Sequence, residues 1–283
     1  MSPVNVTVAI PTYNRPGFLQ RALRCVQAQT LAPLEIIVLD NASEDTTWRE
    51  LPELADPLVR VISHPSNIGV MNNWNKAIEE ARGDAICIFH DDDVMYPRFV
   101  EVTAGLLDRF PQAGMAFTRV RRVDCMGMSL GIWWETEHEG PIAGSDYVLW
   151  CVRRFGTLAL PSAVVYRMST CKAIGGFGGS LSTSAFDAEY FLRVAMHGDV
   201  VFANELLSDY TLHPHQISEE FWRRDRPSGQ TDACLEIMNA GCWLLGRETI
   251  ADDTRREVAQ VMSKATALMA HCVRQRTGTA ATF

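Results

Sequence analysis

Short apolar runs alternate with segments of helical periodicity along residues 6–123, and this alternation constrains the fold more than any other feature of the chain. Runs of strand length occur at residues 6–10, 35–39, 58–62, 85–90 and 114–123. Helices are expected between them, at residues 16–29, 45–54, 70–82 and 97–110. Repeated strand–helix–strand units of this length form a mainly parallel sheet with helices on both faces. The sequence therefore predicts an α/β, doubly wound, Rossmann-like sheet.

The second half of the chain is less regular. Residues 124–161 are expected to form a connecting segment with a helix at 145–154. They are followed by a strand at 162–166, a helix at 184–197 and two short strands at 200–203 and 206–212. Beyond residue 218 the composition turns helical, with candidate helices at 231–249 and 253–274. We therefore expect one domain over residues 1–218 and a C-terminal helical extension over residues 219–283.

Composition limits the classes of function. Of the 283 residues, 47% are hydrophobic and 21% are charged, which is typical of a folded protein with a sizeable core. The formal net charge of −8 argues against binding of nucleic acid. The eight cysteines contain no Cys-x-x-Cys pair, which disfavours a zinc site and fits a reducing compartment. No signal-peptide pattern or stretch of transmembrane length is visible, so we expect a cytoplasmic protein, either free or peripheral at the inner face of the membrane.

Polar residues follow the predicted strands at the points where each strand ends. Pro11 to Arg15 follow the first strand, Asp40 follows the second, and Asp91, Asp92 and Asp93 follow the fourth. In open parallel sheets, ligands bind beyond the carboxyl ends of the strands. Three adjacent carboxylates repel one another, and Mg²⁺ or Mn²⁺ binds oxygen ligands of this kind, usually together with substrate phosphates. The alternative interpretation is a solvated acidic turn that ends at Pro97.

Two familiar nucleotide signatures are missing. The dinucleotide fingerprint Gly-x-Gly-x-x-Gly does not follow the first strand, and no Walker phosphate loop occurs in the chain. Residues 11–17 also lack the glycine-rich, lysine-containing loop of nucleotidyltransferases. Dehydrogenases, NTPases and nucleotidyltransferases are therefore disfavoured.

Several short motifs occur in a fixed order: Ile10-Pro-Thr-Tyr-Asn-Arg, Ile36-Ile-Val-Leu-Asp-Asn-Ala-Ser, Asn67-Ile-Gly with Asn73-Trp-Asn, Gly83-Asp-Ala, Asp91-Asp-Asp with Pro97, Gly175-Gly-Phe, Asp187-Ala-Glu with Leu192-Arg, and Tyr210-Thr-Leu-His. Each motif alone is weak, but the ordered set is specific. With these residues, the chain resembles the family 2 glycosyltransferases of the GT-A fold, which use nucleotide sugars. The resemblance covers roughly residues 4–218.

The resemblance implies a transfer with inversion, from a nucleotide diphosphate-sugar to an acceptor hydroxyl, with Mn²⁺ or Mg²⁺ as cofactor. It implies residues 1–123 as the nucleotide-sugar-binding half and residues 124–218 as the acceptor and catalytic half. Asp187 matches the general base, and Asp92, Asp93 and His213 match a metal site. The residues that match nucleotide-sugar contacts are Pro11, Thr12, Tyr13, Arg15, Asp40, Asn67, Asn75 and Asp91.

Each of these residues also has a purely structural interpretation. Asp40 could form a turn, Tyr13 could be an ordinary loop aromatic, and Asn75 could lie on a polar helix face. Asp187 could cap its helix, and His213 could pack near the sheet edge. The chain also departs from the family pattern: His90 stands where many members have the first Asp of the metal motif, and Phe186 replaces the first acid of a Glu-Asp pair. His215 matches no family residue.

The function and the partners are left with open alternatives. A GT-A domain that binds a nucleotide sugar or a glycan without turnover is the second hypothesis, and the presence of both Asp92 and Asp187 argues against it. The acceptor could be a small metabolite, a glycan or a lipid-linked intermediate. Apolar stripes in the last two helices indicate a helical hairpin that covers part of the acceptor side, and a homodimer seam is a less favoured use of the same stripes.

Overall fold

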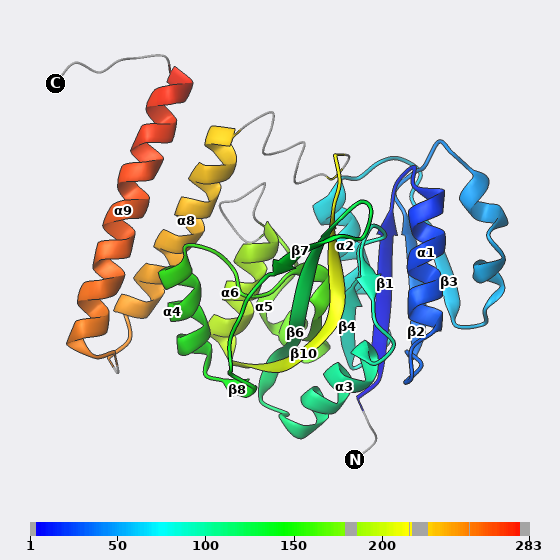
Figure 1. Ribbon diagram of the computed structural model, residues 1–283, viewed down its shortest axis with the longest axis horizontal. Coiled ribbons are helices and arrows are strands. Elements are labelled where there is room, and N and C mark those ends of the chain that lie inside the picture. Colours follow the sequence, from blue (N-terminus) through cyan, green and yellow to red (C-terminus); the bar gives the residue numbers. More distant parts are fainter. Residues whose placement is uncertain (1–3, 179–185, 215, 217–225, 249, 278–283) are drawn as a thin grey trace.

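The computed structural model describes residues 4–178, 186–214, 216, 226–248 and 250–277 of the 283-residue chain. Its centre is one mixed sheet with the strand order β3-β2-β1-β4-β9-β6-β10-β5, to which β7 adds at β6 and β8 adds at β10 (Figure 1). The strands are β1 (Val6–Thr12), β2 (Glu35–Asp40), β3 (Val59–Ser63), β4 (Ala85–Ile88), β5 (Val94–Met95), β6 (Ala113–Asp124), β7 (Ser129–Ile132), β8 (Gly140–Ile142), β9 (Val164–Arg167) and β10 (Asp199–Leu212).

Most of the long strands run in one direction. β3, β2, β1 and β4 pair in parallel, and β6 pairs in parallel with β10. β9 lies between β4 and β6 and is antiparallel to both, so these two neighbours share the direction of the first group. The carboxyl ends of β1, β2, β3, β4, β6 and β10 consequently meet at one edge of the sheet. The mainly parallel, doubly wound architecture expected from the sequence is confirmed.

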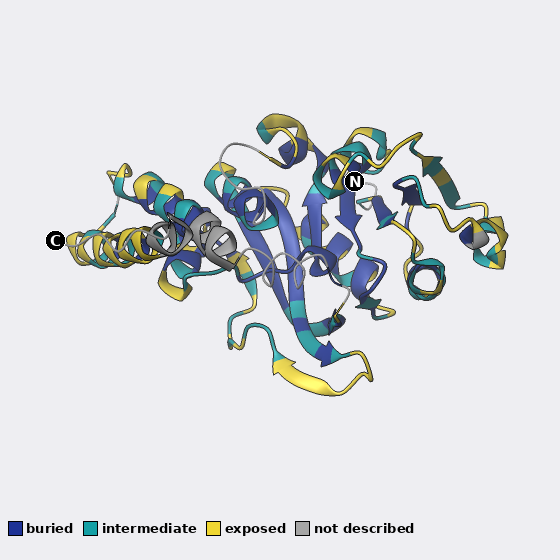
Figure 2. Ribbon diagram, turned by 90° about the horizontal axis from the view of Figure 1, so that it is seen from above, coloured by how far each residue is buried: buried dark blue, intermediate teal, exposed yellow. Residues whose placement is uncertain are grey.

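Helices cover both faces of this sheet, and two hydrophobic cores lie between the layers (Figure 1). Along β2, Ile37 and Leu39 face one core, whereas Ile36 and Val38 face the other, because successive side chains of a strand point to opposite faces. The burial pattern shows the same arrangement, with a buried central sheet between helices that are exposed on their outer sides (Figure 2). The helices are α1 (Pro16–Gln27), α2 (Val70–Glu80), α3 (Phe99–Arg109), α4 (Gly144–Arg154), α5 (Met168–Ile174), α6 (Phe186–His197), α8 (Arg226–Leu245) and α9 (Asp252–Thr277).

The prediction of a helix at residues 45–54 is wrong. Two 3₁₀ turns stand there instead, η1 (Thr47–Glu50) and η2 (Pro52–Ala55). Leu51 between them is extended, with ψ at 124°, as expected for a residue that precedes proline. Pro52 also lacks the N–H that a continuous helix would use.

Four other local differences from the expected elements occur. The short strands at 200–203 and 206–212 are one strand, β10, whose pairing with β6 is irregular around Ala203 and Leu206. Residues 124–161 contain β7 and β8 besides the expected helix α4, and the 162–166 strand begins with a 3₁₀ turn, η3 (Pro161–Ala163). Helix α5, directly after β9, was not predicted.

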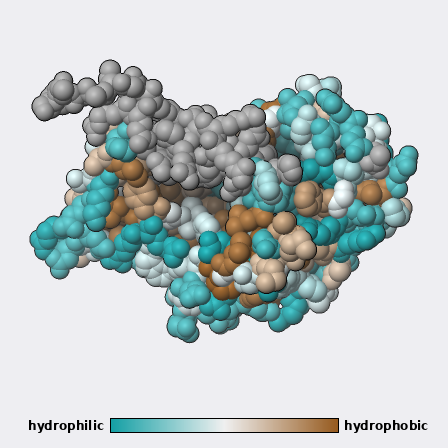
Figure 3. Space-filling model, turned by 45° about the horizontal axis from the view of Figure 1, so that its top comes forward, coloured by the Kyte–Doolittle hydropathy of each residue, from teal (hydrophilic) through white to brown (hydrophobic). Residues whose placement is uncertain are grey.

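The two C-terminal helices pack against each other at one end of the molecule (Figure 1). Cys234, Ile237 and Leu244 of α8 are buried in the core that α4 and α6 also line, and Arg153 of α4 pairs with Glu257 of α9 at 2.8 Å. Within the described ranges, no helix combines the length and apolarity needed to cross a membrane. One face of the molecule shows hydrophilic residues at its two ends and hydrophobic residues gathered near its centre (Figure 3).

Candidate active site at the carboxyl edge of the sheet

The three adjacent carboxylates lie at the carboxyl edge and are buried rather than solvated. Asp91, Asp92 and Asp93 are 3%, 6% and 0% exposed, which excludes the solvated acidic turn. Directly after them, β5 runs antiparallel to β10, pairing Val94 with Asp209. This pairing lays the carboxylates beside the end of β10, where Thr211 and His213 are found.

Asp92 lies among nitrogen atoms of basic side chains. Its Oδ2 atom lies 2.9 Å from Arg15 Nη1 and 3.0 Å from His213 Nε2, and Arg21 donates to its backbone carbonyl. Burial alone would raise the pKa of Asp92, but the hydrogen bond from His213 and the positive charge of Arg15 outweigh it and lower this pKa. Asp92 is therefore ionised at neutral pH.

Both carboxylate oxygens of Asp93 accept hydrogen bonds. Ser162 Oγ donates to its Oδ2 atom at 2.5 Å, and the backbone N–H of Thr211 donates to its Oδ1 atom at 2.9 Å. Burial and the neighbouring Asp92 charge raise the pKa of Asp93 well above its usual value. Metal ligands must be deprotonated, so a cation bound by Asp92 and Asp93 would displace a proton from Asp93, the carboxyl with the raised pKa.

Asp91 connects the carboxylates to the loop after β1. Thr12 Oγ1 donates to Asp91 Oδ2 at 2.8 Å, and Arg15 Nη1 lies 3.3 Å from Asp91 Oδ1. Burial, with the charge of Asp92, raises the pKa of Asp91 to about 6. Arg15 thus bridges two of the three carboxylates while about a fifth of its side chain (22%) stays exposed to solvent.

The residues present fit a divalent cation. Potential ligand atoms of His90, Asp92 and Asp93 lie within 4.8 Å of one another. His90 Nε2 is buried and has no hydrogen-bond partner within the described residues, and desolvation lowers the pKa of this imidazole, which favours the neutral form that binds metals. His90, which replaces the first Asp of the expected motif, is therefore part of the candidate site. His213 contacts this site through its interaction with Asp92.

The loops after β1 and β2 are tied together. Asn14 and Ala42 adopt left-handed backbone conformations, with φ at 54° and 64°. Asn14 Oδ1 accepts hydrogen bonds from the backbone N–H groups of Glu44 and Asp45, and the backbone N–H of Asn14 donates to Ser43 Oγ at 2.9 Å. Left-handed non-glycine residues are costly and cluster at functional sites. The two loops therefore form one preorganised unit beside the carboxylates.

Asp40 and Tyr13 lie in this unit. Asp40 is 1% exposed, and its Oδ1 atom accepts the Ser43 N–H at 3.0 Å, so the turn-forming interpretation of Asp40 is correct. Tyr13 is 40% exposed, and Pro11, within β1, is partly buried. Contacts of these residues with a nucleotide stay predictions.

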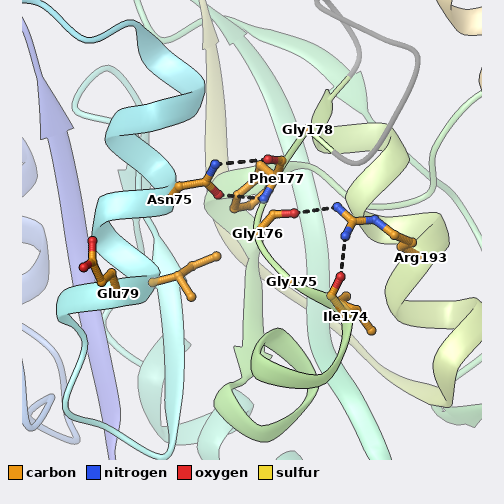
Figure 4. Close-up of a pocket in the computed structure, with 9 residues that line it drawn as sticks. Asn75, Glu79, Ile174, Gly175, Gly176, Phe177, Gly178 and Arg193 are labelled. Atoms are coloured by element: carbon orange, nitrogen blue, oxygen red, sulfur yellow. Dashed lines mark hydrogen bonds between the residues drawn. The ribbon is translucent and has the colours of Figure 1, made fainter.

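Asn67 and Asn75 both hold backbone. Asn67 Oδ1 accepts from Asn41 Nδ2 and from the Gly69 N–H. The Asn75 amide pairs with both backbone groups of Phe177, at 2.6 Å and 3.0 Å. It points away from α2 toward the loop that contains Phe177 (Figure 4). Both amides therefore have structural partners, and their contacts with a nucleotide stay predictions.

A pocket of about 660 Å³ lies between α2 and the loop of residues 175–178 (Figure 4). The polar groups on its wall are already paired: Arg193 donates to the carbonyls of Ile174 and Gly176 and to the Glu189 carboxylate. The polar groups of this pocket thus already have hydrogen-bond partners, and the carboxylates remain the candidate site.

Asp187 lies in the first turn of α6. It is partly buried, its Oδ1 atom accepts the Ala188 N–H at 2.8 Å, and burial raises its pKa. Glu189, the other acid of this turn, is 6% exposed and paired with Arg193 at 2.5 Å. Asp187 is therefore the better placed of the two to exchange a proton. His215 lies outside the described residues.

Several residues of the site were not singled out from the sequence. Ser162 donates to Asp93, and Arg21 donates to the backbone carbonyl of Asp92. The ring of Phe18 packs against His213, with the centroids 5.2 Å apart, and the ring of Trp74 packs against His90, with the centroids 4.8 Å apart. Of these four residues, only Trp74 lies in a motif noted in the sequence, Asn73-Trp-Asn. The others are ordinary residues whose role comes from contacts across the fold.

Residues 7–147, about half of the chain, match the family model described as Glycosyl transferase family 2. The chain belongs to glycosyl transferase family 2. This membership confirms the resemblance inferred from the ordered motifs.

Relatives and solved structures agree with the family. The chain is 27% identical over 227 residues to an uncharacterized protein of Mycobacterium tuberculosis, with 75% of this chain and 66% of that protein covered. It is also 27% identical over 221 residues to a chondroitin synthase of Escherichia coli, with 75% of this chain and 30% of that protein covered. The chain thus spans about two thirds of the first relative and less than a third of the second.

Two solved structures show the fold. Residues 1–349 of S. aureus TarS, in complex with UDP-GlcNAc, align with a TM-score of 0.67 and 14% identity over 93% of this chain and 72% of that one. The mannosyltransferase PcManGT from Pyrobaculum calidifontis, in complex with GDP-Man and Mn²⁺, aligns with a TM-score of 0.60 and 15% identity over all of this chain and 77% of that one. The GT-A fold expected for the family is confirmed.

Proposed function

We propose that this family 2 member is an inverting glycosyltransferase that moves a sugar from a nucleotide diphosphate-sugar to an acceptor hydroxyl with a divalent cation. The observation that carries the proposal is the convergence of Asp91, Asp92 and Asp93 with His90 and His213 at the carboxyl edge of the parallel strands. Buried, mutually repelling carboxylates at this edge suit a cation and a diphosphate better than they suit packing alone.

The cation is Mn²⁺ or Mg²⁺ in this proposal. Asp92 and Asp93 hold it, with His90 and His213 as the neighbouring nitrogen donors. Such a cation, when bound, neutralises the charge that develops on the departing nucleotide diphosphate. Arg15 supplies a fixed positive charge beside the carboxylates, and its partly exposed guanidinium has a geometry suited to phosphate oxygens.

The donor is a nucleotide diphosphate-sugar whose nucleoside end lies over the joined loops after β1 and β2. Asp40 reads the base, Tyr13 packs against it, and Pro11, Thr12, Asn67, Asn75 and Asp91 complete the donor side. The structures of similar fold named above hold UDP-GlcNAc and GDP-Man, and another holds UDP, which supports donors of this class for the present chain.

Asp187 acts as the general base. A sugar hydroxyl is too weak an acid to ionise at neutral pH, so a positioned carboxylate takes its proton as the hydroxyl oxygen attacks the anomeric carbon. The bond from this carbon to the phosphate oxygen breaks in the same displacement, and the nucleoside diphosphate leaves. One displacement inverts the anomeric centre. The raised pKa of Asp187 brings this carboxylate closer to the pH at which a base is effective.

Residues 1–123 form the donor half in this proposal, residues 124–218 complete the catalytic half, and residues 219–283 with α8 and α9 are the extension beside the acceptor. The acceptor is a small metabolite, a glycan or a lipid-linked intermediate. None of the cysteines whose side chains the structure describes forms a disulfide, which supports a reducing compartment such as the cytoplasm, with or without peripheral attachment at the membrane.

Donor binding and turnover in one panel test the proposal. UDP-sugars and GDP-sugars are screened by thermal shift with Mn²⁺ or with EDTA, and each donor that binds is then assayed for nucleoside diphosphate release. We expect Mn²⁺-dependent binding and release by the wild type, loss of both in Asp92→Asn, and retention of both in Asp108→Asn, whose exposed carboxyl lies on α3. Donor binding without release, with any acceptor class, would instead support the non-catalytic GT-A domain. No binding of any donor would reject both.

A further inference from the structure

Three consecutive residues of α2 hold three separate parts of the molecule. Asn73 donates to the carbonyl of Leu39 at the end of β2 and pairs with His64 Nε2 at 2.9 Å. Asn75 holds both backbone groups of Phe177. Trp74, between them, is 5% exposed and turns its indole into the core. The helix therefore connects the donor half of the sheet to the loop that precedes α6.

The Trp74 indole lies at the centre of a four-ring cluster. Its ring centroid is 4.8 Å from that of His90, 4.9 Å from that of Phe186 and 5.2 Å from that of Phe177. Phe186 and Phe177 meet it edge to face, at 67° and 78°, a favourable geometry for aromatic pairs. Such contacts fix the relative positions of three chain segments far apart in sequence.

Two of these neighbours stand directly beside reacting groups of the proposed function. His90 precedes Asp91 and belongs to the group of potential metal ligands. Phe186 precedes Asp187, the proposed base, at the start of α6. One side chain thus touches the residue before the carboxylates and the residue before the base.

The His90 imidazole is held by packing rather than by hydrogen bonds. Its Nε2 atom has no partner within the described residues, and its Nδ1 atom is 3.8 Å from Asp93 Oδ2, which is too long for a hydrogen bond. A histidine that binds metal is usually oriented by a hydrogen bond from its second nitrogen. In place of such a bond, the His90 ring lies against the Trp74 indole, with the two ring planes tilted by 38°.

We propose that Trp74 is a positioning residue that aligns the His90 imidazole for the cation and, through Phe186, sets the place of Asp187 relative to the carboxylates. The inference rests on the proposed function and deepens it, since it names the side chain that links the metal site to the acceptor base. Trp74 touches no reacting atom; it acts only through His90 and Phe186.

Two variants of Trp74 and one matched control test this inference. Trp74→Leu removes the aromatic faces, and Trp74→Phe keeps one ring for His90 and Phe186. Trp48→Leu removes an equally buried tryptophan, 4% exposed, from the core on the opposite face of the sheet. Melting temperature, binding of Mn²⁺ alone by calorimetry, and kcat with the donor found in the screen are measured for all three variants and the wild type.

We expect Trp74→Leu to weaken Mn²⁺ binding about fivefold to tenfold and to lower kcat about tenfold or more, with Trp74→Phe within about threefold of the wild type. Trp48→Leu should have a lower melting temperature but keep the wild-type Mn²⁺ affinity and kcat per folded molecule. Rescue by Phe and an unchanged control separate positioning from general loss of packing.

Two results would overturn the inference. One is wild-type Mn²⁺ affinity and kcat in folded Trp74→Leu. The other is a loss in Trp48→Leu as large as that in Trp74→Leu. If Trp74→Leu does not fold, Trp74→Phe and Trp74→Met replace it, and equal Mn²⁺ affinity in these two would equally contradict a role for the aromatic face. Failure of the proposed function shows differently, as no Mn²⁺-dependent turnover in the wild type itself.

Discussion

His213 Nε2 lies 3.0 Å from Asp92 Oδ2, although the two residues are 121 positions apart in the chain. The contact exists because β5 turns back beside β10 immediately after the carboxylates. The His213 ring also lies against that of Phe18, with the two ring planes tilted by 30°, so it has contacts on two sides. The residues at the end of β10 therefore form part of the carboxylate site.

Removal of this imidazole should weaken the metal site. In His213→Ala, Asp92 loses one of its two short side-chain contacts and the cation loses a proposed nitrogen donor. We therefore expect Mn²⁺ affinity to fall at least about tenfold. Calorimetry with Mn²⁺ alone measures the effect. His197→Gln, an exposed histidine at the end of α6, is the control and should bind Mn²⁺ as the wild type does. Unchanged affinity in His213→Ala would place His213 outside the site.

Asp187→Asn should separate catalysis from stability. Asparagine keeps the size and the capping ability of aspartate but cannot take a proton, so we expect kcat to fall at least about a hundredfold while the melting temperature and donor binding stay near wild type. Glu189→Gln should behave in the opposite way, with a lower melting temperature because the buried pair with Arg193 is broken. Near-normal turnover in Asp187→Asn would move the base elsewhere.

Metal binding should depend on pH through Asp91. Since burial and the Asp92 charge raise the pKa of Asp91 from 3.8 to about 6, the folded protein binds more protons than the unfolded chain between these values. This group therefore contributes stability at low pH that is lost as the pH rises through about 6, whereas Asp92, with its lowered pKa, contributes in the opposite sense. Asp91 is not one of the proposed ligands, but its ionisation adds a negative charge beside Asp92 and Asp93, so Mn²⁺ affinity should increase from pH 5 to pH 7.

The rise in melting temperature on adding Mn²⁺, compared at pH 5 and pH 7 at constant ionic strength, measures this dependence. We expect a clearly larger rise at pH 7. In Asp91→Asn the difference between the two pH values should shrink. An equal rise at both pH values in the wild type would mean that no proton is displaced from this carboxyl.

The C-terminal helices should contribute to the stability of the domain. Leu244 of α8 is 1% exposed within the core shared with α4 and α6, whereas Leu268 of α9 is 36% exposed. Leu244→Ala should lower the free energy of unfolding by about 2–5 kcal/mol, and Leu268→Ala should change it by less than about 1 kcal/mol. Urea unfolding measures both. Equal effects would mean that α8 does not pack on the domain in solution.

Much of the fold followed from the sequence because local patterns decide it. The apolar runs of β1, β2 and β4 are buried on both faces, and the periodicity of α1, α2 and α3 places their apolar stripes on the sheet. The edge where the carboxylates gather followed from the parallel direction of these strands. The helix expected at 45–54 failed because the effect of Pro52 on Leu51 outweighed a weak periodicity.

The chemistry of the site was decided by contacts that no local pattern contains. Asp91, Asp92 and Asp93 are adjacent in the chain but have different partners. Thr12 and Arg15 contact the first, Arg15 and His213 contact the second, and Ser162 contacts the third. Their pKa values move in different directions for this reason. The sequence by itself determined which strand ends carry polar groups, through hydrophobic periodicity and strand direction. Only the tertiary structure decided which charges meet there, because burial and distance, and not position along the chain, set the energy of a charge.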